Sequence, residues 1–362
     1  MDAIADRTEK LARLDRVMDE HDLATVWLAH ADNFGWLLGG DNLVNHRNPE
    51  GVGAIGYDGD ELTVLTTNIE APRLRDEEVP AEVTVDSFPW HDSSLGAEIA
   101  ARTDGPFGAD VALPDAQTID PTTFRMPLTE RDIERSRSLG RDVAAGLEAA
   151  CRVAEPDDNE RDVAAAISAE LQSRGIQPPV VLVGGGSRAP VHRHFTPTDA
   201  RLGEYALASV SATRGGCWVS TTRTIALDPP EWLADRTTKA QQVDVAVIRA
   251  TQTASTAGEA FSALQDAYTA VDEPDEWREH HQGGASGYAG REWVATPDHA
   301  GRVHRPQTYA WNPTVRGAKS EDTVLVTDDG VEVLTTTGEW PTTNVEPAGG
   351  GEPLDRHDIL QL

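Results

Sequence analysis

The order of helix and strand patterns after residue 128 constrains the fold of this 362-residue chain most strongly. Thr129, followed by two acidic residues, is a good helix start, because acids stabilise the positive end of the helix dipole. The apolar face of this helix carries Ile133, Leu139, Val143, Leu147 and Ala150. A second helical pattern starts at Asn159 and ends at Gly175, a residue type common just past helix ends. The sequence therefore predicts two consecutive helices.

Strand and turn signals follow these helices. Strands are predicted over 180–183, 204–210 and 217–226, the last two as an antiparallel pair joined at Arg214-Gly215-Gly216. Residues 236–271 predict one long helix or two. Asp328-Asp329-Gly330 is a strong turn signal and predicts a hairpin of strands 323–327 and 331–335.

The first third of the chain alternates helix and strand signals, which favours an α/β layer. A helix is predicted over 8–21 and strands over 25–29, 62–66, 83–88 and 107–111. We place the domain boundaries so that residues 1–125 form the first domain and 126–340 the second. The last segment, 341–362, contains Gly349-Gly350-Gly351 and is expected to be a loose tail.

The charge of the chain is strongly acidic: 31 basic against 61 acidic residues give a net charge of −30. The acids are distributed rather than gathered in a tail, and only Lys10, Lys239 and Lys319 are lysines. This combination favours adaptation to a salty cytoplasm, where salt screens the self-repulsion. It argues against nucleic-acid binding, which needs basic patches.

The sequence shows no pattern that predicts membrane insertion, secretion or a cysteine-based site. No run of 18 apolar residues is present, so no membrane span is expected, and the first six residues lack the order of a signal peptide. Cys151 and Cys217 are the only cysteines, which gives neither a disulfide framework nor a thiolate metal site. A cytoplasmic location is expected.

The order of the predicted helices and strands after residue 128 resembles the creatinase and aminopeptidase P family of pita-bread peptidases. The strand pair in this order ends in Thr222-Arg223-Thr224. This family includes Xaa-Pro dipeptidases and methionine aminopeptidases, and the resemblance covers nearly the whole chain. It implies an α/β (α+β) fold: a smaller creatinase-like N-terminal domain and a pita-bread C-terminal domain. It also implies a homodimer.

In that family, two metal ions are held by two Asp, one His and two Glu. The matching positions here carry Ser209, Ser220, Gly284 and Asn312, and only Glu321 retains a ligand. A hydroxyl, a glycine and an amide cannot hold two divalent ions at useful affinity. The resemblance therefore predicts a degenerate metal site, and we expect no metal or other cofactor.

Four residues are candidates for catalysis. His192 fits the place of a family histidine that contacts substrate, and Glu321 is the retained glutamate. His281 lies beside the Gly-rich turn, and Lys319 is a lysine in a chain that otherwise uses arginine. We expect all four to line one cleft, neutral to positive, that favours an anionic or carboxylate-bearing ligand.

Four further residues are candidates for substrate binding: His194, Arg291, Glu292 and Asn312. His194 and the nearby His280 are also open to interpretation as hydrogen-bonded structural histidines. Arg291 and Glu292 could equally form a structural ion pair.

Three functions remain open for a small-molecule or short-peptide ligand. The first is a metal-independent hydrolase of a small amide, guanidino compound or Xaa-Pro-like peptide, since creatinase in this family works without metal. In this reading His192 would shuttle a proton, and Glu321 would orient His192 or bind a cationic substrate. The second is a non-catalytic binding module, like the peptidase-like module of a histone chaperone. The third is an Xaa-Pro peptidase with relocated metal ligands: His192, His281, Glu292 and Glu321.

Overall fold

The structure is a computed structural model that describes residues 2–362. The chain divides into two compact units. The N-terminal unit contains the residues up to Asp132 together with 215–217, and the C-terminal unit contains 133–214 and 218–362. Among the described residues, none of the helices combines the length and hydropathy that a membrane crossing needs.

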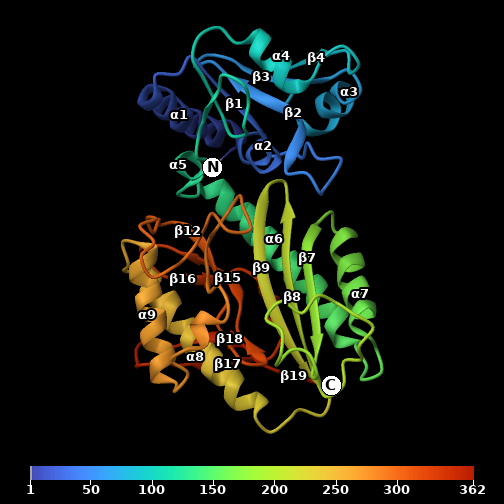
Figure 1. Cartoon of the computed structure of the whole chain (residues 1–362), viewed down its shortest axis with the longest axis vertical. Helices are drawn as coiled ribbons and strands as arrows, with labels where there is room; N and C mark the ends of the chain where they lie inside the picture. Colours follow the sequence, from blue (N-terminus) through green and yellow to red (C-terminus); the bar gives the residue numbers. More distant parts are fainter. Residues whose placement is uncertain (1) are drawn as a thin grey trace. The chain divides into compact units, whose positions relative to one another are not determined.

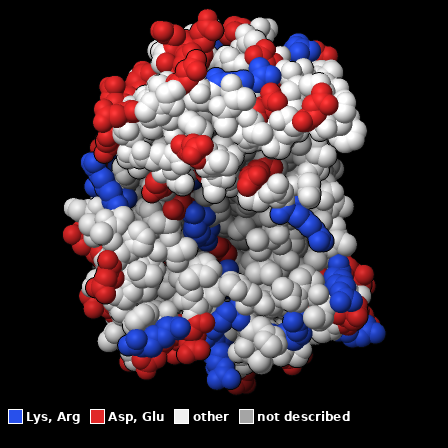
Figure 2. Space-filling view, turned by 45° about the horizontal axis from the view of Figure 1, so that its top comes forward, with Lys and Arg blue, Asp and Glu red and all other residues white. Residues whose placement is uncertain are grey.

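Acidic side chains are spread over the surface. Figure 2 shows Asp and Glu in several separate clusters on the visible face, with Lys and Arg side chains between them. The acid excess in the composition is therefore distributed over this face and does not form one patch.

The N-terminal unit is built on a six-stranded sheet of order β4-β3-β2-β1-β5-β6 (Figure 1). Strand β2 pairs antiparallel with β1 and β3, and the remaining pairs are parallel. The strands are β1 (Thr25–His30), β2 (Glu50–Tyr57), β3 (Leu62–Thr67), β4 (Thr84–Phe88), β5 (Phe107–Ala109) and β6 (Gln117–Thr118). The helices are α1 (Ala3–His21), α2 (Ala31–Leu38), α3 (Ala71–Arg73), the π-helical turn Leu74–Glu78, α4 (Leu95–Arg102) and α5 (Thr122–Arg125).

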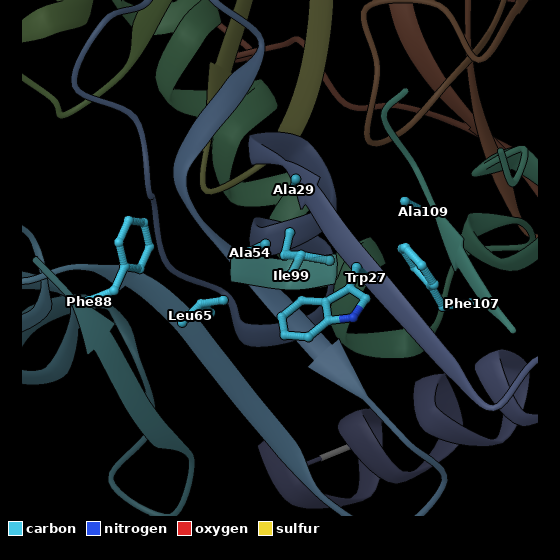
Figure 3. Packing of buried hydrophobic residues seen from close by; sticks show 8 residues of the cluster. All are labelled: Trp27, Ala29, Ala54, Leu65, Phe88, Ile99, Phe107 and Ala109. Atoms are coloured by element: carbon cyan, nitrogen blue, oxygen red, sulfur yellow. The ribbon is translucent and has the colours of Figure 1, made fainter. Parts of the chain in front are cut away.

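The core of this unit lies where the sheet meets α4. Trp27, Leu65, Phe88 and Phe107 come from four different strands, and Ile99 of α4 packs with them (Figure 3). Burial of these side chains is the driving force that holds the sheet and helix together.

Helix α1 begins five residues before the predicted start. The Asp2 side chain accepts hydrogen bonds from the backbone N–H groups of Ile4 and Ala5, which satisfies two donors that a helix start leaves unpaired. A local capping group therefore sets this boundary, which the apolar periodicity alone does not show.

The C-terminal unit has four long helices and several strands. The helices are α6 (Glu130–Arg152), α7 (Glu160–Gln172), α8 (Leu233–Thr251), α9 (Ala257–Ala270) and the short 3-10 turn Glu276–Arg278. The strands are β7 (Gln177–Gly185), β8 (Tyr205–Arg214), β9 (Cys217–Ala226), β10 (Gly283–Ser286), β11 (Trp293–Val294), β12 (Gln307–Trp311), β13 (Thr314–Val315), β14 (Ala318–Lys319), β15 (Asp322–Val326), β16 (Val331–Val333), β17 (Thr342–Val345), β18 (Leu354–His357) and β19 (Leu360–Gln361).

Two larger sheets of this unit are joined by hydrogen bonds. One has the order β19-β9-β8-β7 and the other β11-β10-β12-β15-β16. The Ser220 N–H donates to Thr323 Oγ1 at 2.7 Å, and the Thr222 N–H donates to the Glu321 carbonyl at 2.9 Å. These bonds join β9 to β15. Helices α6 and α7 flank the first sheet, and α8 and α9 lie beside the second (Figure 1).

The predicted helix signals act as expected. Asn159 caps α7 in a reciprocal capping box with Asp162, and Gly175 follows its end at φ +68°. The stretch 236–271 forms two helices, because Thr256 caps a new helix by accepting the N–H of Glu259. The predicted hairpin of β15 and β16 is also confirmed.

The prediction of a loose tail over 341–362 is wrong. Strands β17 and β18 pair antiparallel, and β19 pairs parallel with β9. The three glycines at 349–351 have positive φ and form the turn of this hairpin. Arg356 is buried and forms ion pairs with Asp244 and Asp322, which anchor the segment.

Candidate functional site

A cavity of about 230 Å³ in the C-terminal unit collects most of the predicted site residues. Its lining comes from β7, β8, β9, β14 and the loops beside them: Val180, Leu182, His194, Ser209, Val210, Ser211, Trp218, His281, Gly290, Arg291, Asn312, Lys319 and Glu321. A larger cavity of about 530 Å³ is lined by Arg193, Arg316, four acidic residues and apolar neighbours, and it contains no predicted catalytic residue. The smaller cavity is therefore the candidate site.

Glu321 is a buried carboxylate in this cavity. Its Oε2 accepts from Lys319 Nζ and Thr222 Oγ1, both at 2.7 Å, and its Oε1 accepts from Arg291 Nη2 at 3.1 Å. Burial alone would raise the pKa of Glu321, but Lys319 and Arg291 outweigh burial and lower it. The carboxylate is therefore ionised at neutral pH and held by two cations. Lys319 and Glu321 face the same way because they are two residues apart in extended chain.

Hydroxyl groups surround this ion cluster. Arg291 Nη1 donates to Ser220 Oγ at 3.0 Å, and Ser220 lies 2.6 Å from Ser211 Oγ. Ser209 Oγ lies 2.7 Å from Thr222 Oγ1, the same hydroxyl that donates to the glutamate. The hydroxyls of β8 and β9 thus form a hydrogen-bonded surface beneath the cluster.

The positions where the resemblance expects metal ligands offer few donors. Ser209 and Ser220 use their hydroxyls in the contacts just described. At Gly284, an added Cβ would lie 2.2 Å from the Trp293 carbonyl oxygen, so no larger side chain fits without rearrangement. Within residues 2–362, buried Asn312 Oδ1 finds no hydrogen-bond partner. This donor set fits two divalent ions poorly, since such ions need several oxygen or imidazole ligands.

Three histidines cluster at the edge of the cavity. His194 and His281 line it, and His280 packs beside them with its Nε2 3.2 Å from His194 Nε2. Burial, then Arg291 and Lys319, lower the pKa of His281 to about 4. Burial and then Lys319 lower the pKa of His280 to about 2, and the pKa of His194 is lowered by the same two causes. All three imidazoles are therefore neutral at pH 7.

The expectation that His192 faces the cavity is wrong. Its side chain is exposed and belongs to the lining of neither cavity. The backbone N–H of His192 donates to the Arg188 carbonyl at 3.0 Å, which closes a turn. Three residues on, the buried Phe195 side chain packs against Gly184. With Phe195 fixed in the core, His194 is the histidine of this segment that reaches the cavity.

Glu292 also lies outside the cavity lining. Its Oε1 accepts the Tyr288 N–H at 2.8 Å. The carboxylate that pairs with Arg291 at the cavity is Glu321. The relocated ligand set of His192, His281, Glu292 and Glu321 is therefore not brought together.

Three polar or aromatic residues at the cavity were not candidates in the sequence analysis: Ser211, Trp218 and Thr222. A signal for them was present. Trp218, Ser220 and Thr222 alternate along β9, so they share one face of the strand. Ser209 and Ser211 have the same relation on β8. A row of small hydroxyls at a spacing of two was therefore visible in the sequence.

The joined sheets, with their flanking helices, have the architecture of the pita-bread peptidases. The prolidase from Pyrococcus horikoshii OT3 is 20% identical and has a TM-score of 0.74, covering 91% of this chain and 98% of its own. The Xaa-Pro dipeptidase from Bacillus anthracis is 16% identical, with a TM-score of 0.75 over 98% and 100% of the two chains. The N-terminal domain of FACT complex subunit SPT16 from Cicer arietinum is 14% identical, with a TM-score of 0.69 over 93% and 97%. Identities this low show the fold alone.

The sequence itself shows the family. Residues 134–328, more than half of the chain, match metallopeptidase family M24, and the chain belongs to that family. No curated protein sequence matches it significantly. The family resemblance and the fold class predicted from the sequence are confirmed.

Proposed function

We propose that this M24 protein binds a small carboxylate-bearing amide or Xaa-Pro-like dipeptide and hydrolyses its C–N bond without the family's two metal ions. One observation carries the proposal. Glu321, the retained family glutamate, is held by the ammonium group of Lys319 and the guanidinium group of Arg291. Two fixed cations therefore already satisfy the carboxylate on which a metal pair would depend.

The charge of the cavity supports an anionic ligand. Lys319 and Arg291 carry two positive charges and Glu321 one negative charge, which leaves +1 beside neutral histidines. The whole chain carries −30. A carboxylate would neutralise the local excess, and the low-dielectric walls would strengthen that attraction.

The apolar wall and the volume limit the size of the ligand. Val180, Leu182, Val210 and Trp218 line one part of a cavity of only about 230 Å³. Small-molecule sites combine such apolar surface with a few polar groups that fix orientation. A compound with one carboxylate and a short hydrocarbon part fits this description.

His281 is the group we propose for proton transfer. Its neutral imidazole would take a proton from water, the hydroxide would add to the carbonyl carbon, and the C–N bond would break as the proton passes to the nitrogen. The net reaction adds one water. Lys319 and Arg291 would stabilise the negative charge that develops on oxygen. His194 lines the same cavity and offers a second proton acceptor.

The test uses matched ligand pairs in molar salt. Dipeptides with a free C-terminal carboxylate should bind and be cleaved, their carboxamide forms should bind at least tenfold more weakly, and a chelator should change neither result. Lys319→Met should lose binding, whereas Lys239→Met should not, because Lys239 pairs with Glu273 outside the candidate cavity. Elemental analysis that finds two tightly bound ions per chain would contradict the proposal.

A binding function without catalysis is the second candidate. It is favoured by the pKa of about 4 for His281, because general bases work best when their pKa lies near the working pH. Calorimetric binding of the carboxylate ligands with no product after prolonged incubation would select this function.

The homodimer implied by the family stays a prediction, to be checked by sizing with light scattering in molar salt.

A further inference from the structure

We propose that His194, His280 and His281 bind one transition-metal ion at the edge of the cavity, through a ligand set separate from the family's metal positions. The three side chains each offer a ring nitrogen, and these nitrogens all lie within 4.8 Å of one another. None of the three occupies a position where the resemblance expects a metal ligand. The site is therefore a new one.

The spacing of the first two nitrogens suits a shared ion. Bond lengths of about 2.0–2.1 Å in a tetrahedral zinc site place neighbouring ligand nitrogens about 3.3 Å apart. His280 Nε2 and His194 Nε2 are 3.2 Å apart. The two rings are not stacked but meet edge to face, with an interplanar angle of 69°.

The third ligand needs only a side-chain rotation. His281 stacks on His280 with ring centroids 4.4 Å apart and an interplanar angle of 25°, and its side chain is exposed. Because the ring is exposed to solvent, its rotation gives up little beyond the stacking contact with His280. The rotated ring would complete three ligands and leave a fourth position for water or an anion, as in open zinc sites.

Protein contacts alone do not satisfy this cluster. A hydrogen bond between His194 and His280 would use one nitrogen of each ring. His280 Nδ1 is buried and has no hydrogen-bond partner in the described part of the chain. Buried polar atoms nearly always have a partner, so Nδ1 calls for a water of its own, and the two Nε2 atoms stay available as ligands of the ion.

The ligand chemistry selects the kind of ion. Three neutral imidazoles, with no thiolate and no carboxylate among them, suit Zn²⁺, Ni²⁺ or Cu²⁺ rather than Mg²⁺, Ca²⁺ or Mn²⁺. Lys319 and Arg291 oppose a cation by repulsion, yet burial and the charge of Lys319 lower the pKa of His280 and His281 and so keep these imidazoles free of competing protons. We expect weaker binding than at a structural zinc site, because the two cations oppose the charge of the ion.

Metal binding would regulate the proposed hydrolysis, a consequence that rests on the proposed function. His194 and His281 line the cavity, and an imidazole that coordinates a metal cannot accept a proton. Loading with Zn²⁺ should therefore inhibit turnover. The binding itself does not depend on any activity.

The experiment measures metal binding directly. Titration with Co²⁺ should give the visible absorption of a tetrahedral site at one equivalent, and Zn²⁺ should displace it, as followed by calorimetry in molar salt. His280→Asn should weaken Zn²⁺ binding at least tenfold, and His194→Gln should do the same if the first variant fails to fold. His192→Asn is the matched control, because this exposed histidine lies two residues from His194 and should not matter.

The outcomes separate the two proposals. Zn²⁺ affinity unchanged in both His280→Asn and His194→Gln, or no binding up to millimolar Zn²⁺, overturns the three-histidine site. His280 is not part of the cavity lining, so His280→Asn should leave binding of the carboxylate ligand intact. Loss of carboxylate-ligand binding in Lys319→Met, with unchanged Zn²⁺ affinity, supports both proposals. If the parent protein does not bind the carboxylate ligand, only the proposed function is overturned.

Discussion

Arg291 donates through Nη2 to Glu321 Oε1 at 3.1 Å, inside a cluster that also holds Lys319. The guanidinium comes from the loop before β11 and the carboxylate from the residue before β15, so the pair joins two distant segments. A charged pair of this kind is costly to break from one side, because the remaining charge stays buried.

Arg291→Met should therefore destabilise the protein by about 3 kcal/mol, toward the lower end of the cost for breaking a buried pair, since Lys319 remains beside Glu321. In a Glu321→Gln chain the same substitution should cost less, because Arg291 has then already lost its carboxylate partner. Denaturant unfolding of the parent, both single variants and the double variant gives the coupling energy. Strictly additive effects would show that the two side chains do not interact.

Gly284→Ala should be strongly destabilising. The new Cβ would lie 2.2 Å from the Trp293 carbonyl oxygen, which is backbone and cannot move aside. We expect a loss of more than about 3 kcal/mol, as for severe overpacking. Gly290→Ala is the control, because its Cβ would meet the Trp218 ring at an ordinary 3.5 Å. Equal melting temperatures for the two variants would refute this account of position 284.

Arg356→Met should cost about 3–5 kcal/mol, the range for breaking a buried ion pair. Arg356 is 1% exposed and lies 2.5 Å from Asp244 and 3.0 Å from Asp322. The exposed pair of Arg201 with Asp157 supplies the control, and Arg201→Met should cost less than about 1 kcal/mol. Similar losses in both variants, measured by chemical unfolding, would mean that the buried network contributes nothing special.

Acid should destabilise the folded chain through His280 and His281. Their pKa values fall from 6.5 to about 4 for His281 and about 2 for His280, with burial as the main cause. Below pH 6.5 the unfolded chain takes up protons that the folded chain cannot, so this stability is complete above pH 6.5 and is lost as the pH falls toward 4. The double variant His280→Asn, His281→Asn should lose less stability than the parent between pH 6.5 and 5. An identical pH dependence would contradict the lowered pKa values.

Removing salt should lower the melting temperature by at least several degrees. At 0.1 M salt the Debye length is about 10 Å, against about 3 Å at 1 M, so the −30 net charge repels itself far more strongly in dilute buffer. Calorimetry at both salt concentrations checks this prediction. A melting temperature that is the same in molar salt and in dilute buffer would refute salt adaptation.

Local signals predicted much of the fold because they act over a few residues. The Asp328-Asp329-Gly330 turn and the Asn159 cap both work through contacts within their own segment. The segment 341–362 was missed for the opposite reason. Its strands are largely polar, and its anchor is Arg356, a residue type that patterns assign to the surface.

The site was harder to predict because orientation depends on distant packing. His192 and His194 lie two residues apart, and the burial of Phe195 over Gly184 determines which of them reaches the cavity. Lys319 and Glu321, by contrast, were placed together correctly, since alternation along an extended chain is a local property. The stacking of His280 on His281 occurs in the irregular segment between the 3-10 turn Glu276–Arg278 and β10, which no periodicity shows.

The buried network around Arg223 has a consequence for how the chain is made. Arg223 contacts His357 across 134 residues of sequence, and His357 also binds Asp322. During translation, Arg356 and His357 are synthesised after every residue that lines the cavity. Until then Asp322 and Asp244 lack the partner that Arg356 provides. A chain truncated before β18 should therefore keep two buried carboxylates short of a cation, and we expect it to be more open to proteolysis than the full chain.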